Sequence, residues 1–271
     1  MAAAPLVLLP HSLSVVKARV LPTVVALSTA VVPLRLAPES GARTHRRLSR
    51  LLRTLPSGWQ VIVVDDTASD GAAAATGRTV AGFAPRARYL RHRDTAAAPF
   101  SIGRLRDVGA AAAPDGLVLF HDVDFFAPPG IYRRLDVALA GPLGRELAGG
   151  GFLCLPVAFL SRLGTVAARR IDERRWSAIA SPWARRVGLV DRLVMASSAI
   201  VVDRRVLLAH GGHSTAFTGH GAEDFELMHR LSLSYPRGPR PPDYPVDYGS
   251  RGAERGGFRA YFARYAAPLA V

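Results

Sequence analysis

Cysteine is almost absent from this chain, since Cys154 is the only one among 271 residues. A single thiol can form neither an intrachain disulfide nor a cysteine-based metal knuckle. Long apolar runs are also lacking. Prolines together with Lys17 and Arg19 interrupt residues 1–32, so no stretch of about 18 apolar residues is available to cross a membrane. We therefore expect a cytoplasmic protein.

Acidic residues are scarce relative to basic ones, with 21 Asp and Glu against 35 Lys and Arg, a formal net charge of +14. Such a surface attracts anions, whether nucleotide phosphates, nucleic acid, acidic polysaccharide or an anionic membrane leaflet. The arginines are dispersed and form no long basic block interleaved with aromatic residues, so we expect no nucleic-acid partner. Peripheral contact with the inner face of an anionic membrane is compatible with this charge.

The apolar patterning predicts an α/β fold. Residues 23–32 form a β-branched apolar run closed by Pro33, which is typical of a buried parallel strand. Leucines at helical spacing predict a helix over residues 39–55, and a second buried strand follows at Val61–Val64. Hydrophobic residues make up 49% of the chain, enough for one large domain built on a mostly parallel central sheet.

Acidic pairs follow two of the predicted strands. Asp65 and Asp66 come directly after the strand at Val61–Val64, and Asp122 and Asp124 follow a strand predicted at Leu117–Phe120. Ligands of open α/β sheets bind outside the carboxyl ends of the strands, so we expect both pairs to meet at one site. Carboxylate oxygens suit Mg²⁺ or Mn²⁺, although two acids at this spacing also occur in ordinary loops.

A third acidic pair, Glu223 and Asp224, follows the glycine-rich turn at residues 219–221. It is expected in the first turn of a helix whose inner face carries Phe225, Met228 and Leu231. A helix N-terminus favours ionised carboxylates, which leaves one able to accept a proton from a hydroxyl group. The plainer interpretation is the ordinary preference for acids at a helix start.

Together these motifs resemble the family-2 and family-7 GT-A glycosyltransferases. The closest resemblance is to the bacterial capsule-biosynthesis branch, with its chondroitin-polymerase-like and β-1,4-galactosyltransferase-like domains. The resemblance implies a Rossmann-like GT-A domain over residues 23–235, with a nucleotide-sugar-binding half at 23–135 and an acceptor half at 150–235. An N-terminal extension (1–22) and a tail rich in Pro, Gly and Arg (236–271) would flank it. The matching segments are VIVVDDTASD, RLRDVGAAAAPDGLVLFHDVDFF, LCLPVAFLSRLGT and ASSAIVVDRRVLLAHGGHSTAFTGHGAEDFELMHRL.

The same resemblance implies residue roles and a reaction. The expected reaction is metal-dependent, inverting transfer from a UDP-sugar to a glycan acceptor, in the synthesis of capsule or cell-surface polysaccharide. No histidine follows His229, so the metal is completed by His229, by diphosphate and water, or is not tightly bound. The implied site comprises Asp65 and Asp66 for the nucleoside, Asp122 and Asp124 for metal and diphosphate, Asp224 as base, Glu223 for the acceptor, and Arg104, Arg106 and Asp107 in the donor-binding segment.

Two alternatives stay open on the sequence. A nucleotidyltransferase also combines a nucleotide-binding α/β sheet with metal-holding aspartates, but it has no need of the Glu223-Asp224 helix. A catalytically degenerate transferase that binds nucleotides or polyanions is the second, because of the histidine missing after His229. We expect His121, His213 and His220 to be ordinary hydrogen-bonded loop histidines.

Overall fold

The computed structural model describes residues 28–36, 41–93, 100–125, 127, 129–170, 186–195, 197–217, 221–249 and 256–266. Its strands are β1 (Thr29–Leu34), β2 (Gln60–Asp65), β3 (Ala87–Arg91), β4 (Leu117–Phe120), β5 (Phe152–Cys154), β6 (Val157–Leu160), β7 (Val190–Val194) and β8 (Ile200–Asp203). Its helices include α1 (Gly41–Thr54), α2 (Asp70–Ala81), α3 (Ile102–Ala112), α4 (Pro129–Ala140), α5 (Pro142–Ala148), α6 (Arg162–Arg170), α8 (Arg204–Ala209), α9 (Glu223–Ser234), α10 (Gly257–Phe262) and the 3₁₀ turn η3 (Ala263–Tyr265).

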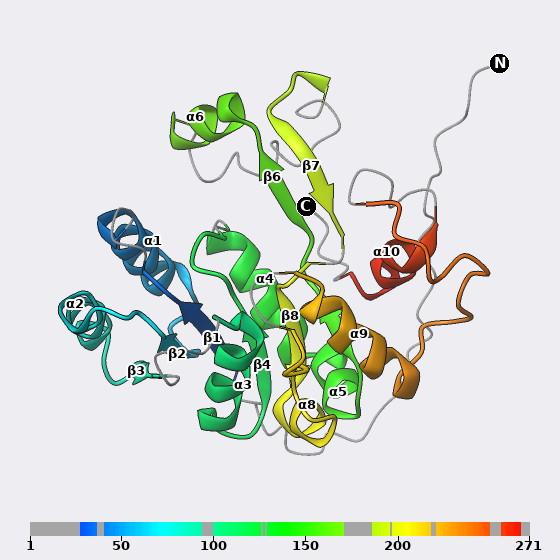
Figure 1. The fold of residues 1–271 in the computed structure, drawn as a ribbon, viewed down its shortest axis with the longest axis horizontal. Coiled ribbons are helices and arrows are strands. Elements are labelled where there is room, and N and C mark those ends of the chain that lie inside the picture. The colour runs from blue at the N-terminus through cyan, green and yellow to red at the C-terminus, as the bar shows by residue number, and fades with distance from the viewer. Residues whose placement is uncertain are drawn as a thin grey trace.

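The central sheet has six strands in the order β3-β2-β1-β4-β8-β5 (Figure 1). The first four are parallel, and β8 runs antiparallel to both β4 and β5. The predicted α/β class with a mostly parallel sheet is therefore confirmed. The carboxyl ends of β1, β2 and β4 lie at one edge, which the amino end of β8 and the carboxyl end of β5 share.

The first strand differs from its prediction at both ends. Residues 23–27 lie outside the described part, and Pro33 lies inside β1 instead of closing it. A proline has no N–H for a sheet ladder. The ladder between β1 and β4 stops at Val31, so on that side the missing N–H of Pro33 costs no strand hydrogen bond.

Alternating residues of the sheet enter two separate cores. Val32, Val63 and Leu119 face a core completed by α1, α4 and α5, whereas Val31, Val64 and Phe120 face a core completed by α3, α8 and α9. Helices thus cover both faces, which explains why β1, β2 and β4 read as continuous apolar runs.

The apolar stretch at residues 152–160 divides between two sheets. β5 joins the central sheet, while β6 pairs antiparallel with β7 in a separate two-stranded sheet. Figure 1 shows β6, β7 and α6 together at one end of the molecule, projecting from the body that holds the central sheet.

The described part of the C-terminal segment packs into the domain. We expected residues 236–271 to form a tail outside it, but Tyr261, Phe262 and Tyr265 are buried in the second core. Tyr265 stacks on Phe152 with ring centroids 4.2 Å apart. Separately, none of the helices in the described ranges is both long and apolar enough to cross a membrane.

Helix α3 approaches the sheet closely through Gly109. A Cβ at this position would lie 2.3 Å from Val31 Cγ1 and 3.0 Å from Val64 Cγ2. Because β-branched side chains are stiff, the strand or the helix would have to move to admit a methyl group.

We predict that Gly109→Ala lowers the free energy of unfolding by about 1–3 kcal/mol through overpacking. Urea titration measures it. Gly71→Ala, in α2, is the matched control, because its nearest atom outside the helix backbone is 4.0 Å from the added Cβ. It should be neutral or stabilising by up to about 1 kcal/mol. Equal effects of the two substitutions would contradict the close approach.

Candidate active site

A buried arginine joins two of the predicted acidic clusters. Arg106 is on the inner face of α3, and its side chain is 1% exposed. Its Nη2 donates to Asp122 Oδ1 at 2.8 Å, and its Nη1 donates to Asp224 Oδ1 at 2.7 Å. Glu223 Oε1 lies 3.6 Å from the same Nη1. The loop after β4 and the start of α9 therefore meet at one guanidinium.

The charges in this cluster stabilise one another. Burial alone would raise the pKa of Asp224, but Arg106 and then His213 outweigh it, and the net pKa is lowered below 3.8. Burial opposes the charge of Arg106 as well, yet Asp224 and Asp122 raise its pKa overall. Asp224 is thus a carboxylate near neutral pH, as a proton acceptor must be.

The acids after β4 differ in exposure. Asp122 is 20% exposed at its side chain, and its second oxygen accepts from Ser198 Oγ at 3.0 Å. Asp124, two residues on, is exposed to solvent. Each carboxylate oxygen can accept more than one bond, so this pair fits a hydrated Mg²⁺ or Mn²⁺ shared with phosphate oxygens. Within the described residues, no three His, Cys, Asp or Glu side chains gather around one ion position.

Helix α9 begins in an unusual backbone conformation. Ala222, at its N-cap, has φ of 68°, the sole positive φ at a non-glycine among the residues described. Gly221 precedes it with φ of 116°, and its N–H donates to Glu223 Oε2 at 2.8 Å. The strained turn aims both first-turn acids at Arg106, and strain of this kind is commonly found at functional sites.

The acids at the end of β2, Asp65 and Asp66, begin a turn at the same edge. Asp65 is fully buried, accepting from the Thr67 N–H and the Tyr89 hydroxyl, each at 2.8 Å. Burial, then Asp65, raises the pKa of Tyr89 to about 12, so that hydroxyl keeps its proton. Asp66 pairs with Arg35 at 2.5 Å. Asp65 therefore holds the turn, and Asp66 is the more accessible of the two.

The remaining predicted residues fall into different surroundings. Arg104 is on the exposed face of α3. Asp107 hydrogen-bonds His213, and its side chain is 25% exposed. His229, expected as a metal ligand, hydrogen-bonds the Tyr244 hydroxyl at 2.8 Å. Residues 218–220, including Gly219 and His220, lie outside the described residues.

His121 is a structural histidine, as expected. It is buried, with Nδ1 2.9 Å from the Asp122 carbonyl oxygen and Nε2 2.7 Å from the Tyr132 hydroxyl. Burial lowers its pKa, so the ring is neutral near pH 7. Its Nδ1–H then donates to the carbonyl, which positions the backbone of Asp122.

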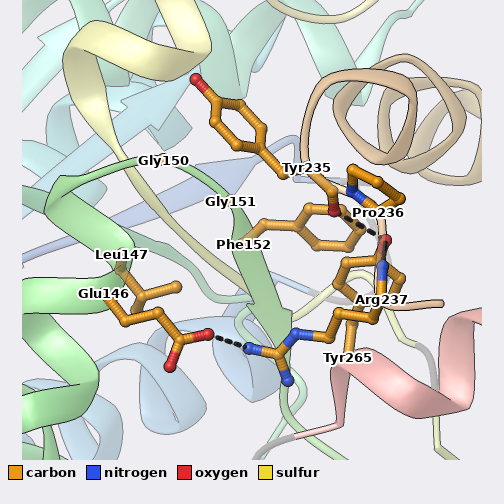
Figure 2. Close-up of a pocket in the computed structure, with 9 residues that line it drawn as sticks. All are labelled: Glu146, Leu147, Gly150, Gly151, Phe152, Tyr235, Pro236, Arg237 and Tyr265. Carbon is orange, nitrogen blue, oxygen red and sulfur yellow. Dashed lines mark hydrogen bonds and ion pairs between the residues drawn. The ribbon is translucent and has the colours of Figure 1, made fainter.

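A pocket of about 210 Å³ lies at the opposite edge of the sheet, beside the amino end of β5 (Figure 2). Its polar groups are bonded to one another. Arg237 pairs with Glu146 at 2.8 Å, and the Tyr265 hydroxyl donates to the Tyr235 carbonyl oxygen. The convergent acids of the Arg106 cluster therefore make a better candidate for chemistry than this pocket.

The comparisons with known proteins agree with the α/β fold. A family model described as "Glycosyltransferase like family 2" matches residues 29–270, nearly the whole chain. The chain belongs to this family. Membership favours a glycosyltransferase of the GT-A type over the nucleotidyltransferase alternative. A search of curated proteins found no match.

Solved structures resemble this family member only distantly. TarS 1–349 of S. aureus is 14% identical, with 76% of this chain and 55% of that chain covered and a TM-score of 0.48. Its complex with UDP is 14% identical, with 74% of this chain and 54% of that chain covered and a TM-score of 0.49. A Pyrobaculum calidifontis mannosyltransferase in complex with GDP-Man and Mn²⁺ is 18% identical, with 80% of this chain and 55% of that chain covered and a TM-score of 0.47. This chain spans about half the length of these structures.

The sequence did not indicate every residue that this glycosyltransferase family member brings to the site. Ser198 precedes β8 and reaches Asp122 from the antiparallel part of the sheet, which no local motif predicts. Arg106 was expected to contact the donor. Its burial could have been read from Ile102, Leu105 and Gly109, whose spacing places Arg106 on the inner face of α3.

We predict that Arg106→Met costs about 3–5 kcal/mol of unfolding free energy near pH 7, because it leaves buried acids without their cation. The lowered pKa of Asp224 contributes stability that is present above 3.8 and lost as the pH falls through the lowered value. The difference in unfolding free energy between wild type and Arg106→Met should therefore narrow as the pH falls below 3.8.

Urea titration at several pH values checks this. Arg43→Met, on the exposed face of α1, is the matched control and should change stability by less than about 0.5 kcal/mol. A loss for Arg106→Met no larger than the control, or one that does not depend on pH, would contradict the account.

Proposed function

We propose that this chain is a metal-dependent, inverting glycosyltransferase that moves a sugar from a nucleotide-sugar, with UDP as the expected nucleotide, to a glycan acceptor. The observation that carries the proposal is the meeting of Asp122 with Glu223 and Asp224 at the buried guanidinium of Arg106. A group that holds the donor phosphates and a group that accepts a proton must lie on either side of the reacting carbon. This cluster brings candidates for both together.

The charge of the cluster supports a requirement for a divalent cation. Asp122, Asp124, Glu223 and Asp224 outnumber the single buried guanidinium, so the site is net negative. A nucleoside diphosphate would be repelled there unless a cation arrived with it. Asp122 and Asp124 would hold that cation, which, when bound, would stabilise negative charge on the departing diphosphate.

Asp224 is the proposed general base. Its lowered pKa keeps it ionised, and its position in the first turn of α9 adds the favourable field of the helix N-terminus. With its proton passing to Asp224, the acceptor oxygen would bond to the anomeric carbon on the face opposite the diphosphate, whose bond to that carbon would break, and the configuration would invert. Arg106 keeps Asp224 in place during this step through the 2.7 Å bond.

Glu223 is proposed to hold the acceptor. Adjacent helical residues point about 100° apart, so Glu223 and Asp224 cannot act on the same hydroxyl. Glu223 Oε2 already accepts from the Gly221 N–H, which fixes its direction. The positive surface of the chain suits an anionic acceptor, such as an acidic cell-surface polysaccharide or a glycan held at an anionic membrane.

We predict that UDP binding strengthens in the presence of Mn²⁺, and that Asp124→Ala abolishes the strengthening. Asp124 is the cleaner substitution because Asp122 also holds Arg106. Calorimetry measures both titrations. Asp115→Ala removes an acid that is 73% exposed and pairs with Arg204, and it should bind as wild type does. If the wild type binds UDP equally well with and without Mn²⁺, the metal assignment is wrong.

We predict that Asp224→Asn lowers kcat by on the order of 10²-fold or more with donor affinity nearly unchanged, because it keeps the shape and removes the basicity. Glu223→Gln should mainly raise the KM for the acceptor. Glu226→Gln, on the same helix but paired with Arg230, is the control. Steady-state kinetics decide the roles, and near-normal turnover of Asp224→Asn would remove it as the base.

A further inference from the structure

His213 is buried between α3 and α9, in the loop that follows α8. Its side chain is 1% exposed. Its ring centroid is 5.3 Å from that of Phe120, the last residue of β4. A Cβ on Gly103 would lie 2.8 Å from His213 Cβ, so the lack of a side chain at Gly103 makes the room for this histidine.

Asp107 holds His213 by two bonds. Its Oδ1 lies 2.7 Å from Nδ1 of the ring, and its Oδ2 accepts from the His213 backbone N–H at 2.7 Å. Gly212, with φ of 65°, lets the loop come this close, since a Cβ there would lie 2.5 Å from Asp107 Oδ2. These contacts fix both the orientation of the imidazole and the nitrogen that faces Asp107.

The other ring nitrogen faces the proposed base. His213 Nε2 lies 3.7 Å from Asp224 Oδ1, the oxygen that also accepts a hydrogen bond from Arg106. This Nε2 is buried and makes no hydrogen bond with any described residue. Arg106 and Asp107 are neighbours on α3. Arg106 bonds Asp224 directly, and Asp107 holds His213, whose ring is the second basic group beside Asp224.

We propose that His213 is a positioning residue that, held by Asp107, orients the Asp224 carboxylate and keeps it ionised for catalysis. The inference rests on the proposed function, since it assigns His213 a role through the base of that reaction. It predicts that one imidazolium and one guanidinium share the same carboxylate oxygen.

The charged groups around His213 favour its protonated form. Burial lowers its pKa, but Asp107 and Asp224 outweigh both burial and the nearby Arg106, and the net pKa is raised above 6.5. At pH values below this raised pKa, His213 is therefore an imidazolium beside Asp224. Loss of this cation should raise the pKa of Asp224, because fewer groups then offset the burial that opposes ionisation.

The first test is NMR titration of the histidine rings in the full chain. We expect the pKa of His213 to exceed 6.5 in the wild type and to fall in both Asp107→Asn and Asp224→Asn. A histidine that only fills space would respond to Asp107→Asn alone. An unchanged His213 pKa in Asp224→Asn would overturn the inference whatever the reaction proves to be.

The second test is the pH dependence of kcat with a nucleotide-sugar and an acceptor. His213→Gln should move the acid limb upward by about one pH unit, since a charge near 4 Å is removed from Asp224. Asp107→Asn should move it in the same direction by less. His45→Gln, at a histidine bonded to Thr76 between α1 and α2, should not move it.

The outcomes separate this inference from the function on which it rests. An active wild type whose acid limb stays in place in both His213→Gln and Asp107→Asn overturns the inference and leaves the function standing. A wild type that transfers no sugar from any nucleotide-sugar overturns both. Should His213→Gln fail to fold, Asp107→Asn still tests the claim, because it keeps the size of the side chain and one acceptor oxygen while removing the negative charge that favours the imidazolium.

Discussion

The buried guanidinium of Arg106 is the interaction on which the site depends. A lone arginine at this depth would be strongly disfavoured, and so would Asp122 and Asp224 without it. Each charge is stable only because the others are present, at 2.7 and 2.8 Å. The cluster therefore fixes the loop after β4 relative to the first turn of α9, two segments that are about 100 residues apart in the chain.

Helix α3 links this cluster to the sheet. Gly109 brings the helix against β1 and β2. Three residues earlier, Arg106 donates hydrogen bonds to Asp122 and Asp224. Asp107, the next residue, reaches His213. Packing and chemistry are thus set by one helix, so a small shift of α3 would disturb the core and the acidic cluster together. The strained N-cap at Ala222 completes the arrangement from the α9 side.

Much of the architecture could be predicted because it is local. The strands ending at Asp65 and Phe120 and the helix beginning at Glu223 are visible as apolar periods bounded by acids and glycines. The surroundings of His213 are not visible in this way, because they depend on a loop closing against α3. His229 was predicted from a resemblance alone, and the side chain it contacts is that of Tyr244, beyond the end of α9. Single-residue roles therefore need the tertiary contacts.

The central claim is that donor sugars bind at the Arg106 cluster. Hydrogen-exchange mass spectrometry with a panel of nucleotide-sugars and Mn²⁺ tests it most directly, because it locates the protected backbone without assuming a reaction. The account predicts slower exchange in residues 117–125 together with residues 222–228. Protection confined to residues 146–152 and 235–237, around the pocket at the other edge of the sheet, would contradict it.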